Sequence, residues 1–363
     1  METVYVGVDL HASQLTVHQI VEAGAGKLTR HREVVATAQV DSFLERLPRG
    51  AQVCVEASTA TFSFARAARE NGAEVHVVHA LGMRNLYDTG KKTDRVDAKK
   101  LAERLRRHLL DDDPEHEFPE VWIPDAATEE MRTLFGNYEF VRRQLVATKN
   151  RLALVFRRRL IQMPDYTSAS ISAHREDPRL REEDQYELEL GLEHLALLET
   201  QRDAIRRRIE RRAVDIYPGE IRLLVSIPGI SVFIAAAVMA EIGTIDRFRT
   251  PKRLSTYLCA APTVDASGGK QRIGGLNKRG RKRTYRFLLQ ALSHIVGNTT
   301  PYSQFLERKR RGKALCKVRA ALVRKTIVAI FYILKNKEIY RFSNDALYAR
   351  KLKEINRLVS QAA

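Results

Sequence analysis

The sequence predicts an α/β domain followed by a long helical segment and a mostly helical basic domain. Three observations lead to this prediction. The first hundred residues alternate short β-branched runs with helical periods, the middle of the chain carries two heptad-like patterns, and the last third combines apolar helical runs with most of the positive charge. A chain of 363 residues with 44% hydrophobic content can form two or three domains, each with its own core.

The N-terminal region predicts three adjacent strands, at residues 3–9, 14–22 and 28–36, followed by alternating helices and strands. The later elements are a helix near 39–47, a strand at 51–57, a helix at 61–71, a strand at 73–80 and a helix that includes the basic amphipathic segment 89–105. This order, βββαβαβα, is that of the ribonuclease H fold, which has a mixed five-strand sheet with helices on both faces. We therefore expect an RNase H-like (RuvC-like) mixed sheet here.

The middle of the chain predicts two long helices after a linker. The acidic stretch 111–125 contains three prolines and ends the first domain. From Met131, and again from Leu188, apolar residues recur at alternating spacings of three and four, which is typical of a coiled coil. Pairing of the two helices within one chain and oligomerisation both remain open. We expect domains with these bounds: 1–110, 126–213 and 217–340, with a helical tail at 341–363.

The positive charge is concentrated in one module. The net charge of the chain is +18, whereas residues 217–337 contain 24 Lys and Arg and five acids, a net of +19. Interleaved apolar helices and Gly-rich turns indicate a folded domain that binds phosphates, so nucleic acid is favoured over an anionic membrane surface. The start of the chain has no signal-peptide pattern, and the longest apolar runs are nine residues, too short for a membrane span. We expect a cytoplasmic, nucleoid-associated protein without a membrane partner.

The cysteines and a helix-hairpin-helix pattern indicate which kinds of binding site the sequence can form. Three scattered cysteines fit neither a disulfide framework nor a zinc site. Residues 217–243 form the pattern of a helix-hairpin-helix with a turn at Ile227–Ile230, whose amides can hold a DNA phosphate. Ser231 stands where a second glycine is common, and plain helical packing is the alternative for this element.

Four carboxylates occupy positions that suit a metal site. Asp9 and Glu56 end two strands that lie side by side in the proposed sheet, and Asp94 and Asp97 share one face of the last helix. Together they can hold two Mg²⁺ or Mn²⁺ ions for in-line attack on a phosphodiester. Taken singly, the helical pair also fits a structural role, as a cap or as partners of nearby lysines and arginines.

A second constellation lies at residues 261–289. Between Lys270 and Arg286 the chain has eight cations, several glycines and no acid, which predicts a nucleic-acid contact surface; a solvated basic loop is the alternative. Ser267 precedes a Gly-Gly pair, where a serine is ordinarily structural and only rarely a nucleophile. The expected nucleic-acid-binding residues are Lys270, Arg272, Lys278, Arg279, Arg281, Lys282, Arg283 and Arg286.

The order of these motifs resembles a known family. VGVDLHAS, VCVEAS, KTDRVDAKKLAERL, LLVSIPGIS, YLCAAP and SGGKQRIGGLNKRGRK together resemble the DEDD transposases of bacterial insertion sequences, in the one-ten group with the Piv invertases and the bridge-RNA-guided recombinases. The resemblance implies that Asp9, Glu56, Asp94 and Asp97 are the metal-binding tetrad and that Ser267 is the DNA nucleophile. Cys259 stands where the family often has glycine, and Ala266 where a second serine is frequent.

The resemblance also implies the partners. They are double-stranded DNA at the element ends and at the target, a structured guide RNA, and further copies of the chain, as a dimer that becomes a tetramer with active sites built from the acidic domain of one subunit and the serine of another. Three alternatives remain: a RuvC-like endonuclease or Holliday-junction resolvase that uses water, an ATPase of the actin and sugar-kinase type, and a non-catalytic nucleic-acid-binding protein. The missing second phosphate loop disfavours the ATPase, and the tetrad disfavours the last.

Overall fold

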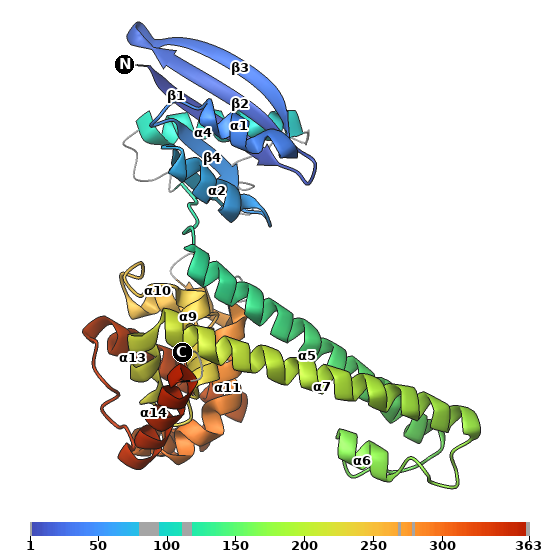
Figure 1. Cartoon of the computed structure of the whole chain (residues 1–363). Helices are drawn as coiled ribbons and strands as arrows, with labels where there is room; N and C mark the ends of the chain where they lie inside the picture. Colours follow the sequence, from blue (N-terminus) through green and yellow to red (C-terminus); the bar gives the residue numbers. More distant parts are fainter. Residues whose placement is uncertain (1, 80–93, 111–117, 268–269, 278–279, 361–363) are drawn as a thin grey trace. The chain divides into compact units, whose positions relative to one another are not determined.

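The computed structural model describes residues 2–79, 94–110, 118–267, 270–277 and 280–360; for 25, 94–96, 264–267 and 270–273 it describes the backbone only. The chain forms two compact units, an N-terminal unit of Met1–Pro124 and a C-terminal unit of Asp125–Ala363 (Figure 1). Each unit has its own core. The finer division of the C-terminal unit into a long-helix segment, a basic domain and a tail stays a prediction.

The N-terminal unit is built on a five-strand sheet in the order β3-β2-β1-β4-β5. β1 pairs antiparallel with β2 and parallel with β4, so the sheet is mixed, as the sequence predicts. The strands and helices follow the predicted order, with these bounds: β1 Thr3–Leu10, β2 Gln14–Ala23, β3 Lys27–Ala36, α1 Val40–Glu45, β4 Gln52–Glu56, α2 Thr61–Glu70, β5 Glu74–Val78 and α4 Asp94–Leu110. Residues 89–93 of the basic amphipathic segment lie outside the described residues.

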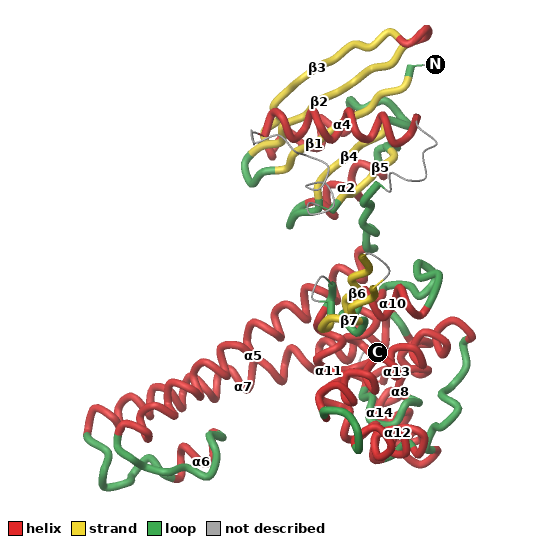
Figure 2. Tube along the Cα trace, turned by 180° about the vertical axis from the view of Figure 1, so that it is seen from behind, coloured by secondary structure: helices red, strands yellow, loops and turns green. Residues whose placement is uncertain are grey.

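Helices cover both faces of this sheet because the strand side chains alternate between two apolar sets. Val6, Val8 and Val53 pack with Phe43 of α1 and Phe64 of α2 on one face. The residues between them on the strands, with Tyr5 and Cys54 among them, pack on the other face against α4. Figures 1 and 2, which view the molecule from opposite sides, show α1 and α2 over one face and α4 over the other.

The described part of the expected linker adds to the sheet. Val121 donates a backbone hydrogen bond to Val77, and His79 donates one to Pro119, so these residues run along the outer edge of β5. The Phe118 ring stacks on His108 of α4 at 4.5 Å. This irregular segment therefore covers an edge that would otherwise expose unpaired amides.

Two long helices, α5 (Ala126–Arg158) and α7 (Glu182–Ile216), pair with each other in the C-terminal unit. They run antiparallel, because Arg212 near the end of α7 binds Glu130 near the start of α5. Pairing within one chain is thus confirmed. A Cβ at Gly191 of α7 would lie 2.3 Å from the Leu152 side chain of α5, so glycine permits the close contact.

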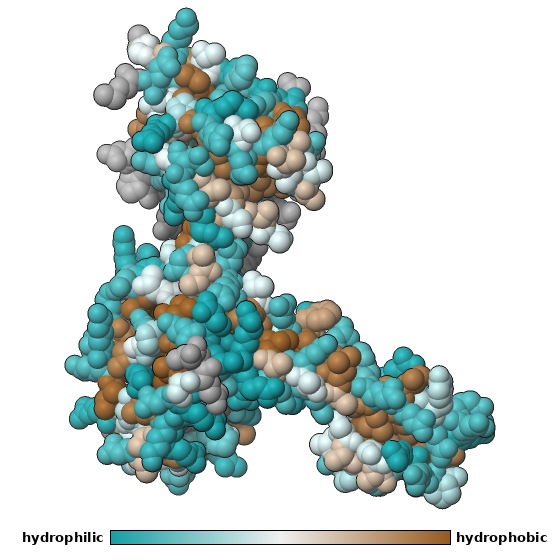
Figure 3. Space-filling model, in the orientation of Figure 1, coloured by the Kyte–Doolittle hydropathy of each residue, from teal (hydrophilic) through white to brown (hydrophobic). Residues whose placement is uncertain are grey.

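Hydrophobic residues also gather on the outside of this pair, as Figure 3 shows. Leu154 of α5 and Tyr186, Leu190 and Leu197 of α7 are each at least half exposed. Oligomerisation through these helices, and the coiled-coil geometry itself, stay predictions.

The rest of the C-terminal unit is a helical body with one small hairpin. Its core contains residues from α5 and α7 together with those of the later helices. The elements are α6 Ser168–Ala173, α8 Pro218–Val225, α9 Val232–Ile242, α10 Pro251–Tyr257, β6 Pro262–Ser267, β7 Lys270–Leu276, α11 Lys282–Gly297, α12 Thr300–Arg310, α13 Leu315–Asn336 and α14 Asp345–Ser360. Among the described helices, none combines the length and the apolar character that crossing a bilayer requires.

The turn between α8 and α9 is occupied by contacts within the chain. Lys351 of α14 donates hydrogen bonds to the carbonyls of Val225 and Ile227, at 2.8 and 3.0 Å. Gly229 has a positive φ of 85°, and a Cβ there would lie 2.8 Å from the Ile295 amide of α11. These contacts support the packing alternative for this element, and phosphate binding by the turn stays a prediction.

Candidate active site and nucleic-acid interface

Asp9 and Glu56 stand at the same end of two neighbouring parallel strands. Val8 of β1 pairs with Val55 of β4, so the next residue on each strand is one of these carboxylates. By alternation, both lie on the face that Gly7 and Cys54 present to α4. Two carboxylates from separate stretches of sequence therefore lie on one face of the sheet, at the carboxyl ends of two adjacent strands.

The end of β4 is fixed by hydrogen bonds. The buried Thr61 hydroxyl donates to the Glu56 carbonyl at 2.6 Å and accepts from the Ser58 amide at 2.9 Å. The Ala57 amide donates to Val78 of β5 at 2.9 Å. These bonds hold the backbone on both sides of Glu56. They therefore fix the position of the Cα atom from which the exposed carboxylate side chain projects.

Asp9 has a nearby polar group of its own. His11 Nε2 lies 3.1 Å from Asp9 Oδ2, and both side chains are partly exposed. In its protonated form the imidazole adds a positive charge beside this carboxylate. In its neutral form it serves as a donor that orients Asp9.

The direction of α4 brings its first turns toward Asp9. Near its middle, α4 crosses β1 at Gly7, where a Cβ would lie 2.0 Å from the Ala98 carbonyl oxygen. Near its C-terminal end, Arg106 makes a bidentate pair with Glu22, at 3.0 and 2.8 Å, and these hydrogen bonds lower the pKa of Glu22. Glu22 pairs with Thr3 at the opposite end of β1 from Asp9. The helix therefore runs antiparallel to β1, and its start lies toward the carboxyl end of that strand.

Asp94 and Asp97 occupy the first turn of α4. Asp97 is half-buried, and Asp94 begins the helix, with its side chain outside the described residues. Among the side chains that are described, no three acids, histidines or cysteines are grouped closely enough to hold a metal ion. The four candidates supply oxygen donors only, from elements that approach one edge of the sheet, which is the chemistry that Mg²⁺ and Mn²⁺ prefer.

The cysteine beside the site is inert. Cys54 lies beneath α4 with no exposed surface, and burial raises the pKa of its thiol far above the usual value. A protonated, buried thiol is neither a metal ligand nor a nucleophile at neutral pH.

Ser267 ends the first strand of the β6–β7 hairpin. Its backbone pairs with Lys270 across the turn, and residues 268–269 lie outside the described residues, as do the side chains of Ser267, Lys270 and Arg272. The structure therefore places Ser267 at a hairpin turn, and it describes no contact of the hydroxyl.

The segment after the hairpin is held against α10. The Arg281 amide donates to the Tyr257 carbonyl at 2.8 Å, and a Cβ at Gly280 would lie 2.5 Å from the same oxygen. Cys259 has a positive φ of 59°, a conformation that favours glycine. This explains in physical terms why glycine suits the position where this chain has Cys259.

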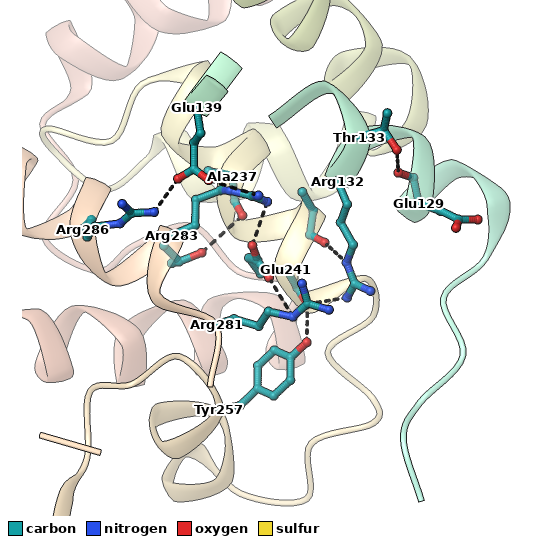
Figure 4. Close-up of polar contacts among 12 residues, drawn as sticks. Glu129, Arg132, Thr133, Glu139, Ala237, Glu241, Tyr257, Arg281, Arg283 and Arg286 are labelled. Carbon is teal, nitrogen blue, oxygen red and sulfur yellow. Dashed lines mark hydrogen bonds and ion pairs between the residues drawn. The ribbon is translucent and has the colours of Figure 1, made fainter. Parts of the chain in front are cut away.

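Arg283 corrects the predicted nucleic-acid-binding set. Its side chain is only 13% exposed and pairs with Glu241 at 2.8 Å and with Glu139 of α5 at 3.4 Å (Figure 4). Arg283 therefore has a structural role, because its charge is already neutralised by the buried Glu241 and the partly buried Glu139. Arg281 and Arg286 are more exposed but also pair with Glu241 and Glu139 respectively.

Of the other predicted cations, Lys282 is exposed and has no ion-pair partner among the described residues. Lys278 and Arg279 lie outside the described part of the chain. Nucleic-acid contacts by these three residues stay predictions.

Glu241 is the centre of a polar cluster that the sequence analysis did not identify. It belongs to α9, its side chain is 2% exposed, and its backbone carbonyl accepts from Arg132 at 3.2 Å and from the Tyr257 hydroxyl at 3.2 Å. Arg247 donates to the next carbonyl, that of Ile242, at 2.8 Å. These groups satisfy the C-terminal carbonyls of α9 and complement the negative end of its dipole, although burial lowers the pKa of both Arg132 and Arg247.

One signal of this cluster was present in the sequence. Glu241 is a single acid at the end of an otherwise apolar run, and a buried carboxylate requires cationic partners. The identity of those partners, Arg281 and Arg283, was not predictable, because they lie on the far side of the β6–β7 hairpin and Arg283 is 42 positions away.

Comparison with known proteins identifies relatives for both units. A transposase family model for the DEDD domain matches residues 6–158, and a second, described as the Transposase IS116/IS110/IS902 family, matches residues 221–306. A probable family 20 transposase of Pseudomonas aeruginosa is 25% identical over 362 residues, covering 93% of this chain and 98% of the relative. The transposase of insertion sequence element IS1111A from Coxiella burnetii is 28% identical over 120 residues, about a third of either chain.

Solved structures of Thermus thermophilus RuvC are also similar to part of the chain. The free protein has 15% identity and a TM-score of 0.24 and covers 33% of this chain and 100% of its own. The complex with a Holliday junction substrate has 17% identity, the same TM-score and the same coverage.

Proposed function

The chain belongs to the IS116/IS110/IS902 family of DEDD transposases and is a DNA transposase; we propose that it cuts and rejoins DNA with a carboxylate tetrad and a serine nucleophile. The observation that carries the proposal is the convergence of Asp9, Glu56 and the first turn of α4 on one edge and one face of the sheet. A role in folding alone would not require two carboxylates at neighbouring strand ends, on the face and at the end toward which the acidic start of α4 is directed.

Divalent metal dependence follows from membership of the DEDD family. We propose that Asp9, Glu56, Asp94 and Asp97 hold two Mg²⁺ ions, with Mn²⁺ as a substitute. When bound there, the metal supplies positive charge that stabilises the pentavalent phosphate and lowers the pKa of an attacking hydroxyl. The protein itself contributes the fixed end of β4, the His11 contact to Asp9, and an α4 held on the sheet by Gly7 and the Arg106–Glu22 pair.

Ser267 is the proposed nucleophile. Its Oγ attacks the scissile phosphorus, the bond from phosphorus to a deoxyribose oxygen breaks, and that oxygen leaves as a hydroxyl after taking up a proton. The hydroxyl of a new partner strand then attacks the phosphoserine, and Ser267 regains its proton. Each step exchanges one phosphodiester for another, so the reaction needs no ATP. The backbone position at the end of a hairpin strand supports this role because turns and loops often carry the functional residues of a domain.

The proposal extends to partners. We propose that a structured RNA chooses the target and donor DNA and that a dimer becomes a tetramer across two DNAs. The resemblance to bridge-RNA-guided recombinases supports the first part, and the exposed apolar residues on α5 and α7 support the second. Sequencing the nucleic acid that copurifies with the protein tests the guide: an RNA encoded beside the gene is expected, and purification with DNA alone would remove this part of the proposal.

A covalent adduct separates the serine mechanism from hydrolysis. We expect the wild-type protein to form a protein–DNA species on a nicked substrate that survives a denaturing gel, and peptide mapping to place the DNA on Ser267. Ser267→Ala should abolish adduct and recombination while DNA binding persists. Ser172→Ala, an exposed serine of α6, is the matched control and should leave both intact. Recombination by Ser267→Ala, or cleavage by the wild type without any adduct, would favour a RuvC-like endonuclease that uses water.

A further inference from the structure

The end of α12 and the start of α13 carry a dense cluster of cations. We call this cluster the α12–α13 surface; its members are Arg308, Lys309, Arg310, Arg311, Lys313 and Lys317. All are exposed except Lys309, which is half-buried. Glu307 is the only acid in the sequence of these two helices and their connection. Six like charges within ten residues repel one another, so the cluster destabilises the free protein.

Among the residues that the structure describes, these cations form no ion pairs. Within the described structure, no member of the α12–α13 surface lies within salt-bridge distance of a carboxylate, whereas the basic residues at the start of α11 pair with Glu139 and Glu241. A set of unpaired cations with no structural use is the electrostatic footprint expected for a polyanion.

Three members of the α12–α13 surface border a pocket with a volume of about 370 Å³. Lys309, Lys313 and Lys317 line it, together with the apolar side chains of Phe305 and Val318. A lysine ammonium is a mobile point charge that suits a phosphate oxygen. The pocket is therefore a place where cations from two helices face one shared space.

The helix dipole adds to the same charge. α13 has 22 residues and begins at this pocket, with no acidic residue in its first turn and no side chain capping its amides. The positive end of a helix favours a bound anion, and here it supplements the lysines that line the pocket.

We propose that the α12–α13 surface binds the phosphodiester backbone of duplex DNA, as a contact distinct from the β6–β7 hairpin. Figure 2 shows α12 at the end of the C-terminal unit opposite the hairpin. The proposal rests on the DNA transposase assignment and requires neither the tetrad nor Ser267. A lipid surface fits less well, because Leu315 is the one large apolar side chain among the described residues 300–325 that is strongly exposed, too little for insertion into a bilayer interface.

Charge neutralisation tests the surface. We expect the triple variant Lys309→Gln, Lys313→Gln, Lys317→Gln to bind duplex DNA about 10- to 100-fold more weakly at moderate salt, with a log–log salt slope shallower by about two to three units. The matched control removes three exposed cations from α5 and α7, as Arg143→Gln, Arg207→Gln, Arg208→Gln, and should change affinity much less. An equal loss in both triples would show that only total charge matters and would overturn the proposal.

Cys316 provides an independent readout. It is exposed at the start of α13, whereas Cys54 and Cys259 are buried, so N-ethylmaleimide should label the native full-length protein at this one position. We expect duplex DNA to slow labelling several-fold in the wild type and hardly at all in the lysine triple. Unchanged labelling with saturating DNA would contradict the proposal. Protection by anionic vesicles or by structured RNA, without protection by duplex DNA, would assign the surface to that partner instead.

Both measurements are made in EDTA without strand chemistry. Their failure therefore leaves the tetrad and Ser267 untouched, and loss of strand cleavage in a tetrad variant leaves the α12–α13 surface untouched.

Discussion

Two basic segments of the C-terminal unit look alike in the sequence and differ in the structure. The segment at the start of α11 and the α12–α13 surface each concentrate cations within a few residues. In the first, Arg281, Arg283 and Arg286 pair with two glutamates from α5 and α9. In the second, no cation has a carboxylate partner among the described residues. Local charge density in the sequence therefore does not show whether a group of cations forms ion pairs within the protein or remains available to bind a polyanion. The difference depends on whether acids from distant parts of the sequence pack against the cations.

The largest loss of stability is expected when Glu241, the buried carboxylate that pairs with the cations at the start of α11, is replaced. Glu241→Gln leaves Arg281 and Arg283 without their buried carboxylate, which should destabilise the protein by roughly 3–5 kcal/mol. Urea unfolding followed by circular dichroism measures this change. Glu307→Gln, an exposed acid beside the α12–α13 surface, is the control and should shift stability by less than about 0.5 kcal/mol. A Glu241 variant as stable as this control would remove the distinction between the two segments.

Variants of the adjacent residues Lys282 and Arg283 should affect different properties: one should change DNA binding and the other protein stability. Arg283→Gln leaves buried Glu241 without its nearest partner and should cost about 2–4 kcal/mol of stability. Lys282→Gln should leave stability nearly unchanged and reduce the salt slope of DNA binding by about one unit. Unfolding curves and binding isotherms of the two variants provide the comparison, and the reverse pattern would refute the assignment of Arg283 to the interior.

Lowering the pH is expected to have a smaller effect on stability, through an ion pair between the two long helices. Arg159 at the end of α5 donates to Asp184 of α7, and this bond lowers the pKa of Asp184. A carboxylate with a lowered pKa stabilises the folded state above its ordinary pKa, near 4, and this contribution is lost as the pH falls through the folded value. Asp184→Asn should therefore be less stable at neutral pH, by on the order of 1 kcal/mol, and its stability should fall less on acidification.

Unfolding midpoints between neutral pH and pH 3, for the wild type and the variant, measure this difference. Parallel pH profiles for the two proteins would show that the pair contributes nothing. The lysine triple of the α12–α13 surface is a useful reference, because no carboxylate pair is removed there and its acid profile should match that of the wild type.

The sheet was predictable because its determinants are local. The β-branched and apolar runs of β1 and β2, short turns, and the glycine after α2 set each strand within about two residues of the observed bounds. The heptad-like pattern predicted α5 and α7 for the same reason, and Gly191 against Leu152 shows how a seam position can require a small residue. The element order then determined which strand ends are neighbours, and so predicted that Asp9 and Glu56 follow paired residues on adjacent strands.

The contacts that position the site were harder to predict from the sequence. Gly7 in the middle of an apolar strand is a signal of close backbone approach, and it could have predicted the crossing of α4. The Arg106–Glu22 pair joins residues 84 positions apart, and Arg283 was assigned to a DNA surface because its partners lie 42 and 144 positions away. Such pairs depend on tertiary packing, which composition and periodicity do not report.

The carboxylate tetrad is the central claim, and strand cleavage by single charge-removing variants tests it most directly. We expect Asp9→Asn, Glu56→Gln, Asp94→Asn and Asp97→Asn each to lose cleavage of element-end DNA by at least about 100-fold while folding and DNA binding in EDTA stay close to wild type. Asp41→Asn, on α1 over the opposite face of the sheet, should cleave normally. Full cleavage by two or more of the four variants, or wild-type cleavage undiminished by EDTA, would contradict a metal-binding tetrad.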